Sequence, residues 1–228
     1  MTKGERMASN LPICERRVVV FDFDGTIADT KASIMSTATT VLREWGIPER
    51  DLKRVGELIG PPFPQAYEQV FGLSHEDAVE VTRRYRDIYN YLGVEGWPAF
   101  PGIAELLADL KAAGKALTVA SSKRSYLVRQ GLEDNQLLDL FDSVRAKEHD
   151  GEATKADAIR ASLVDVGATA GDAVMVGDRH HDVDAATACG IPCVGVLYGN
   201  TAEPGELEQA GAAAITATVD ELRSVLLG

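Results

Sequence analysis

The sequence predicts an α/β protein, with a doubly wound parallel sheet of Rossmann-like type and an all-helical segment inserted after its first strand. From about residue 100 onward, short β-rich apolar runs alternate with helical patterns, as in a parallel sheet covered by helices on both faces. One more run of this kind, Val18–Asp22, lies far upstream. The stretch between them, from Thr30 to Gly96, has helical spacing and no strand signal.

Each element of the alternating region can be assigned in order. The predicted strands are Val18–Asp22, Ala116–Ser121, Phe141–Ala146, Ala173–Gly177, Pro192–Val196 and Ala213–Thr216. The predicted helices are Ile103–Ala113, Arg124–Leu132, Lys155–Val166, Asp182–Cys189, Pro204–Ala210 and Val219–Leu227. Five glycines fall at or near helix ends, where a left-handed cap is expected: Gly114, Gly131, Gly167, Gly190 and Gly211.

The inserted segment contains at least two predicted helices. Apolar residues at helical spacing run from Ile34 to Trp45 and stop at Gly46. A second helix follows Ser74, with Asp77 three residues later as a capping box. We expect a flexible tail over residues 1–13, a core domain formed by residues 14–29 and 98–228, and a helical cap domain over residues 30–97.

Composition excludes several classes of protein. The 228 residues carry a net charge of −12, so a nucleic-acid-binding face is not expected. A hydrophobic content of 45% excludes wholesale disorder, and no apolar run is long enough to span a bilayer. The three cysteines lack a metal-type spacing, which favours free thiols in the cytoplasm. A monomer or homodimer without membrane partners is expected.

Polar residues follow several predicted strands, at the edge where open α/β sheets bind ligands. They are Asp22, Asp24 and Thr26 after the first strand, Ser121 and Ser122 after the second, Lys155 at a helix start, and Asp178 and Asp182 after a later strand. Carboxylates and water form the hard-oxygen site that Mg²⁺ prefers. Lys, Ser and backbone N–H groups suit phosphate oxygens. The set therefore predicts metal-assisted phosphoryl transfer.

Each of these signals alone also fits another role. Ser121 and Asp182 could be helix N-caps. A lysine at a helix start opposes the macrodipole, which favours a functional reason for Lys155, and Lys147 is the alternative. The adjacent pair His180–His181 suggests zinc, but neighbouring residues seldom aim at one ion and no third soft ligand is nearby.

Taken in order, the motifs resemble a known family. DFDGT at Asp22–Thr26, then Ser121, Lys155 and GDRHHD at Gly177–Asp182, resemble the four motifs of the haloacid dehalogenase (HAD) superfamily. The resemblance covers the chain from Val18 to Leu227 and implies a Rossmann-like core, and the helical insertion looks like a C1-type cap.

Two further segments resemble the phosphoglycolate phosphatase-like branch of that superfamily, some members of which are described as 5′-nucleotidases. They are IGPP at Ile59–Pro62 and FPGI at Phe100–Ile103. The resemblance implies a Mg²⁺-dependent phosphatase that hydrolyses a small phosphate monoester, phosphoglycolate-like, with a 5′-nucleotidase as the alternative. A phosphomutase, which usually lacks the threonine at position 26, and a non-catalytic ligand-binding module are further alternatives.

The resemblance also implies roles for individual residues. Asp22 attacks phosphorus and becomes an aspartyl phosphate. Asp24 protonates the leaving oxygen and then deprotonates water, and neighbouring carboxylates are expected to raise its pKa. Mg²⁺ is held by the Asp22 carboxylate, the Asp24 backbone carbonyl and Asp178. Asp182 contacts the metal-binding residues without binding the metal itself, or it orients Lys155.

The remaining expectations concern phosphate and substrate contacts. The resemblance assigns Ser121, Ser122, Lys155 and Thr26 to the phosphoryl group. In the insertion, the Arg83, Arg84 and Arg86 cluster could bind a second anionic group or form a solvated face. Tyr67, Tyr85, Tyr89 and Tyr91 could stack on a base or pack the cap. Arg124 is a candidate substrate contact.

Overall fold

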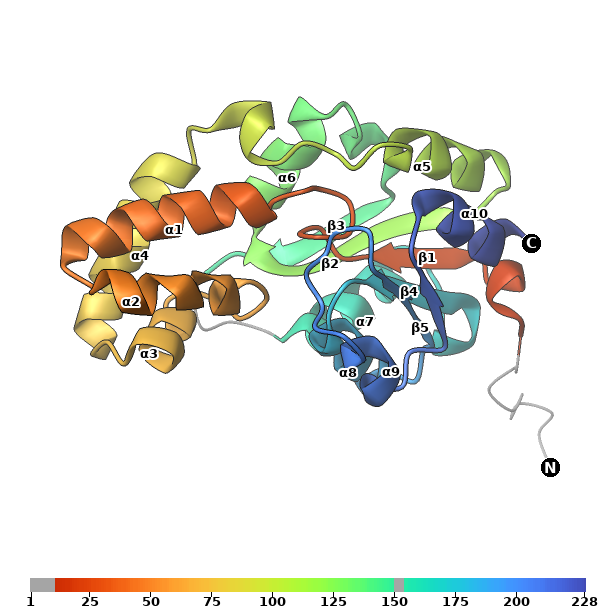
Figure 1. Ribbon diagram of the computed structural model, residues 1–228. Helices are drawn as coiled ribbons and strands as arrows, with labels where there is room; N and C mark the ends of the chain where they lie inside the picture. The colour runs from red at the N-terminus through yellow and green to blue at the C-terminus, as the bar shows by residue number, and fades with distance from the viewer. Residues whose placement is uncertain (1–10, 150–153) are drawn as a thin grey trace.

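The computed structural model describes residues 11–149 and 154–228, in which six strands form one parallel sheet of order β3-β2-β1-β4-β5-β6 (Figure 1). The strands are β1 (Val18–Phe21), β2 (Ala116–Arg124), β3 (Ser143–Lys147), β4 (Ala173–Gly177), β5 (Cys193–Val196) and β6 (Ala214–Thr216). The predicted fold class is confirmed. Strand β2 runs three residues past its predicted end at Ser121, and residues 1–10 of the predicted tail lie outside the described residues.

Helices cover both faces of the sheet. One face carries α5 (Ile103–Ala112), α6 (Ser125–Asp134) and α10 (Val219–Leu227), and the other carries α7 (Lys155–Asp165), α8 (His180–Ala188) and α9 (Glu206–Ala210) (Figure 1). Successive residues of β1 point to opposite faces, with Val19 and Phe21 in one core cluster and Val18 and Val20 in the other. Both faces are buried, which explains why the strands are continuous apolar runs.

Four of the five glycines predicted at helix ends have the expected positive φ, but Gly131 does not. Gly131 lies inside α6, where an added Cβ would come 2.4 Å from Cζ of the Phe23 ring. The glycine therefore allows α6 to approach the loop after β1, and the prediction of a helix end at this position was wrong.

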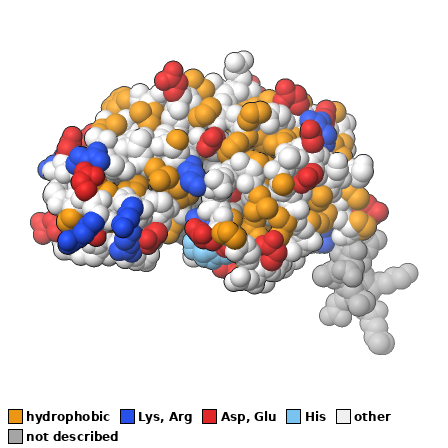
Figure 2. Space-filling model, in the orientation of Figure 1, with side chains coloured by type: hydrophobic (Ala, Val, Ile, Leu, Met, Phe, Trp, Pro, Cys, Tyr) orange, Lys and Arg blue, Asp and Glu red, His pale blue; other side chains and the backbone are white. Residues whose placement is uncertain are grey.

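The chain between β1 and β2 is helical where the sequence predicts it. It contains α1 (Lys31–Trp45), α2 (Glu49–Leu52), α3 (Gln65–Phe71), α4 (His75–Tyr89) and short 3₁₀ turns at Lys53–Leu58 and Gly93–Gly96. The Ser74 side chain accepts the Asp77 N–H and begins α4, as predicted, but the Asp77 carboxylate accepts the Ser74 hydroxyl, so the predicted capping box is formed only in part. On the face shown in Figure 2, basic side chains of this insertion lie beside acidic ones, and the ion pairs include Arg43–Glu49 and Arg54–Glu57.

The chain leaves and re-enters the sheet region through two adjacent segments. Ala28 forms an antiparallel bridge with Ala99, and the Asp29 N–H donates to the Pro98 carbonyl at 2.8 Å. The Asn135 side chain, at the end of α6, donates to the Trp97 carbonyl and accepts from the Ala99 N–H. These contacts fix the direction in which the insertion leaves the sheet and place it over the carboxyl ends of the strands.

Candidate active site

A pocket of about 110 Å³ lies between the carboxyl edge of the sheet and the helical insertion. Phe21, the last residue of β1, pairs with Val119 of β2 and Val176 of β4, so the residues that follow these strands meet at one edge. The sheet side of the pocket includes Asp22, Asp24, Ser121, Ser122, Lys155, Asp178 and Asp182. The insertion contributes Ile34, the loop from Leu58 to Phe63, Tyr85, Arg86 and Tyr89.

Asp22 lies at the base of the pocket, where the backbone N–H donates to the Val176 carbonyl and holds the residue at the strand end. Its carboxylate is buried, and Oδ1 has no hydrogen-bond partner, although the Lys155 Nζ atom lies 3.1 Å from it as an ion pair. Burial raises the pKa of Asp22 to about 6; Lys155 opposes this, and Asp182 and Asp24 add to it. An oxygen that is buried, poorly satisfied and open to the pocket can accept a cation or attack an electrophile.

Lys155 begins α7, as predicted, with Thr154 as its N-cap. Its Nζ atom donates to Asp182 Oδ1 at 2.5 Å and faces Asp22. Burial alone would lower the pKa of Lys155, but Asp182 and Asp22 raise it above its ordinary value, so the ammonium stays charged. Lys147, the alternative, lines the pocket from the end of β3.

Asp182 is not a helix N-cap. Helix α8 begins at His180, two residues earlier than predicted, and Asp182 is its third residue. From there Oδ2 accepts the backbone N–H groups of Asp178 and Arg179, both at 3.1 Å. The approach of this carboxylate requires Gly177, because a Cβ there would lie 2.2 Å from Asp182 Cγ.

Asp178 is buried at the end of β4 beside the DFDGT loop. Burial, followed by the charges of Asp182 and Asp22, raises its pKa. Its carboxylate accepts hydrogen bonds from Thr26 Oγ1 at 3.4 Å and from the Thr201 hydroxyl. Sequence reasoning did not identify Thr201, which lies in the loop after β5 without any motif. The hydroxyl of Thr26 is fully buried against Asp178, and Thr26 is not among the residues that line the pocket.

Asp24 has an unexpected partner. The sequence predicted that other carboxylates would be the important neighbours of Asp24. In the structure the Lys123 Nζ atom donates to Asp24 Oδ1 at 2.8 Å. The same ammonium donates to the Tyr89 hydroxyl at 3.1 Å, at the end of α4. A signal for Lys123 did exist: it lies two residues after Ser121, at the strand end where open α/β sheets bind ligands.

The other predicted contacts divide into two groups. Arg86, Arg124, Tyr85 and Tyr89 line the pocket. Arg83 and Arg84 lie on the outer face of α4, where both pair with Glu80, so the predicted basic cluster is split by the helix. Tyr67 is buried in the insertion and Tyr91 is largely exposed.

Arg179, which sequence reasoning missed, donates to the Ile59 carbonyl at 2.7 Å and so connects the insertion to the loop after β4.

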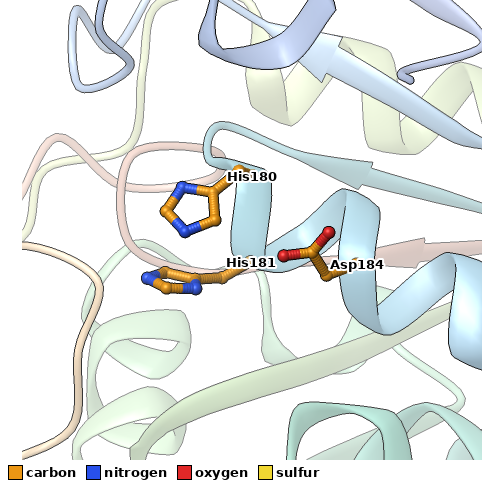
Figure 3. Close-up of side chains that lie close together, drawn as sticks. All are labelled: His180, His181 and Asp184. Atoms are coloured by element: carbon orange, nitrogen blue, oxygen red, sulfur yellow. The ribbon is translucent and has the colours of Figure 1, made fainter. Parts of the chain in front are cut away.

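The histidine pair lies beside Asp184, but one of its ring nitrogens already has a partner. Atoms of His180, His181 and Asp184 come within 4.8 Å of one another at the start of α8 (Figure 3). The two imidazole rings, however, lie against each other with centroids 3.8 Å apart. The two ring planes are inclined at 46° to each other, so their in-plane lone pairs do not share one direction. His180 Nδ1 is engaged by Glu206 at 2.8 Å.

The buried carboxylates fit a hard cation better. Oxygens of Asp22, Asp178 and Asp182 lie within 4.8 Å of one another, and Asp22 Oδ1 has no hydrogen-bond partner. Gly25 has a φ of +74°, and a Cβ there would lie 2.1 Å from Asp178 Oδ2, so the loop must approach this cluster closely. Oxygen donors of this kind suit Mg²⁺. Asp182 is held by the Lys155 ammonium and by two backbone N–H groups, whereas Asp178 accepts from two neutral hydroxyls, so Asp22 and Asp178 are the better placed carboxylates to bind it.

Comparison with known proteins identifies the family. Residues 19–196 match the model of the haloacid dehalogenase-like hydrolases. The chain belongs to this family. The predicted HAD resemblance and the prediction of a HAD-type enzyme are thereby confirmed at the level of the family.

Within the described residues, none of the helices is long and apolar enough to cross a membrane.

Several HAD relatives are similar over most of their length. A 5′-nucleotidase of Pseudomonas aeruginosa is 35% identical, over 79% of this chain and 82% of the relative. Tyrosine-protein kinase PtkA of Mycobacterium tuberculosis is 35% identical, over 92% of this chain and 72% of the relative. A phosphoglycolate phosphatase of Caulobacter vibrioides is 30% identical, over 82% of each. The crystal structure of a predicted phosphatase from Clostridium acetobutylicum superposes with a TM-score of 0.86 at 33% identity, covering 93% of this chain and 98% of that one.

Proposed function

We propose that this protein is a Mg²⁺-dependent phosphatase that hydrolyses a small, phosphoglycolate-like phosphate monoester through an aspartyl phosphate. One observation carries the proposal: the buried Asp22 carboxylate faces a pocket with the Lys155 ammonium 3.1 Å away and Asp178 beside it. A nucleophile, a cation for the phosphoryl oxygens and an acidic metal site are thus brought together. The phosphoglycolate phosphatase and 5′-nucleotidase among the relatives support the same class of reaction.

In the proposed reaction, an Asp22 carboxylate oxygen bonds to phosphorus while the bond from phosphorus to the leaving oxygen breaks. Asp24, which must be in its protonated form for this step, gives a proton to that oxygen, and the alcohol departs. Water then attacks phosphorus, Asp24 accepts its proton, and the bond to Asp22 breaks to release phosphate. Lys155 is charged in the free site because Asp182 and Asp22 raise its pKa above the ordinary value.

Other residues position the reacting groups. Ser121 and Ser122 line the pocket at the end of β2 and would donate to phosphoryl oxygens. In place of the phosphate contact predicted from the sequence, the Thr26 hydroxyl is assigned to holding Asp178. Mg²⁺ would be held by Asp22, Asp178 and the Asp24 backbone carbonyl, and when bound it neutralises negative charge on the phosphoryl group.

The helical insertion, residues 30–97, would act as a cap over a core of residues 14–29 and 98–228. It contributes Tyr89 and the loop from Leu58 to Phe63 to the pocket wall, opposite the reacting carboxylates. A cap in this place excludes water from the leaving-group side and selects the substrate.

A 5′-nucleotidase is the second candidate, supported by aromatic residues on the wall of the pocket. The rings of Phe63, Tyr85 and Tyr89 face it, although they pack on one another, with Phe63 and Tyr85 centroids 5.1 Å apart. The volume of about 110 Å³ is below the range of about 300 Å³ and upward for larger ligands. The pocket as it stands therefore favours a smaller ester, and a nucleotide requires the insertion to open further.

The test is phosphate release by purified protein with Mg²⁺ from 2-phosphoglycolate, nucleoside monophosphates, sugar phosphates and p-nitrophenyl phosphate. Asp22→Asn serves as the blank and should lower turnover at least about 1,000-fold with an unchanged fold. A covalent adduct of one phosphoryl group, found by mass spectrometry in acid-quenched wild type and absent from Asp22→Asn, would support the intermediate. Full activity of Asp22→Asn would refute the mechanism.

A further inference from the structure

Lys123 is a buried ammonium on the wall of the pocket, and the proposed reaction gives it no task. Its side chain is 8% exposed and extends from β2 into the pocket. Burial alone would lower its pKa, but Asp24 and Tyr89 raise it above the ordinary value, so the group is charged. A charge in this position affects any molecule that enters the pocket.

Three contacts hold the Nζ atom of Lys123 in place. It donates to Asp24 Oδ1 at 2.8 Å and to the Tyr89 hydroxyl at 3.1 Å. It also lies 4.7 Å from the centroid of the Tyr89 ring and 5.9 Å from that of Phe23. These aromatic faces attract a cation and exclude water from it. Lys123 is therefore preorganised and does not have to be drawn in from solvent.

The position of Lys123 relative to the reaction follows from Asp24. In the proposed function Asp24 touches the leaving oxygen, and Lys123 Nζ is its direct neighbour. Lys123 thus lies on the leaving-group side of the pocket, whereas Lys155 lies on the phosphoryl side with Asp22. A substituent one or two bonds from the leaving oxygen comes within reach of Nζ.

An ammonium has three N–H donors, and the described residues provide two acceptors, Asp24 and Tyr89. The third donor is left for a ligand. Arg86 and Arg124 line the same pocket.

We propose that Lys123 determines specificity by binding a carboxylate on the leaving group of the substrate. The inference rests on the proposed function and adds to it the residue that selects an acidic ester over a neutral one. The size of the pocket favours a carboxylate over a second phosphate. A charge-assisted hydrogen bond made in a buried site would change kcat/KM by about 10- to 100-fold.

The test compares two esters of similar size, 2-phosphoglycolate and ethylene glycol monophosphate, in the full-length protein with Mg²⁺. Wild type should prefer phosphoglycolate, and Lys123→Met should lower the ratio of the two kcat/KM values about 10- to 100-fold, mainly through the KM of phosphoglycolate. The loss of the Asp24 contact affects both esters and cancels in the ratio. Lys123→Arg, which keeps the charge, should retain most of the preference.

Lys111→Met is the matched control, because Lys111 pairs with Asp142 on the surface, away from the pocket, and should leave both rates unchanged. If Lys123→Met does not fold, Lys123→Gln provides the same ratio. A wild type without preference, or a variant ratio within about threefold of wild type, would overturn the inference while the phosphatase assignment stands. If neither ester is hydrolysed in an Asp22-dependent way, the proposed function fails and this inference fails with it.

Discussion

Asp182 binds Lys155 with one carboxylate oxygen and the backbone of the loop after β4 with the other. Oδ1 accepts from Lys155 Nζ at 2.5 Å, and Oδ2 accepts the N–H groups of Asp178 and Arg179 at 3.1 Å. One buried side chain therefore fixes the direction of the lysine toward Asp22 and the position of the loop that carries Asp178. The phosphoryl side and the metal side of the proposed site are linked through it.

Asp182→Asn should destabilise the protein by about 3 kcal/mol. A neutral amide has one acceptor oxygen, so its NH₂ group must face either the Lys155 ammonium or the two backbone N–H groups. Urea unfolding gives the loss of free energy. Asp157→Asn is the matched control, since Asp157 is also the third residue of a helix, in an exposed capping box, and should cost about 1 kcal/mol. Equal losses in the two variants would contradict this account of Asp182.

The pH dependence of stability should reveal the burial of Asp22. Its pKa is raised from an ordinary 3.8 to about 6 by burial, so the folded state favours the protonated carboxyl. This favourable contribution is complete below about pH 4 and is lost as the pH rises through 6. In the presence of EDTA, Asp22→Asn should therefore gain up to about 3 kcal/mol relative to wild type between pH 4 and pH 7. Urea unfolding across this range measures the difference, and a difference independent of pH would contradict the prediction.

The sequence was sufficient to predict the sheet because its strands are buried on both faces. Such strands are continuous apolar runs, and β4 was predicted with its observed bounds, Ala173–Gly177. The residues that follow the strands could be assembled into one site because the carboxyl ends of parallel strands meet at one edge. Asp22, Asp178 and Lys155 are brought together for this reason.

The contacts that the sequence did not reveal depend on the fold rather than on local patterns. Lys123 and Asp24 are 99 residues apart in the chain, and nothing near either residue specifies their meeting. Thr201, which binds Asp178, lies in a loop without a motif. Gly131 was misplaced because a glycine at a helix end and a glycine required by a neighbouring ring, here Phe23, look alike in a sequence.

Metal dependence should follow from the carboxylate cluster. Chelation of Mg²⁺ should abolish phosphate release, and Ca²⁺ should not restore it, because its looser coordination disturbs in-line attack. Asp178→Asn should weaken Mg²⁺ binding, measured by calorimetry, at least about tenfold. Asp184→Asn, at the exposed histidine cluster, is the control and should bind Mg²⁺ as wild type does. Equal rates of phosphate release with Ca²⁺ and Mg²⁺ would contradict the role given to metal coordination. Weaker Mg²⁺ binding by Asp184→Asn alone would place the metal at the histidine pair.

Two glycines with positive φ allow the close approach of the DFDGT loop to Asp178 to be tested apart from backbone strain. Gly25 and Gly46 have φ values of +74° and +95°, so alanine is strained at both, by about 1 kcal/mol or more. At Gly46 nothing lies within 4 Å of the added Cβ, whereas at Gly25 the Cβ would lie 2.1 Å from Asp178 Oδ2. Gly25→Ala should therefore lower the free energy of unfolding by at least about 2 kcal/mol more than Gly46→Ala, and it alone should weaken Mg²⁺ binding. Similar losses of stability with unchanged Mg²⁺ binding in both variants would show that the loop does not need to approach Asp178 so closely.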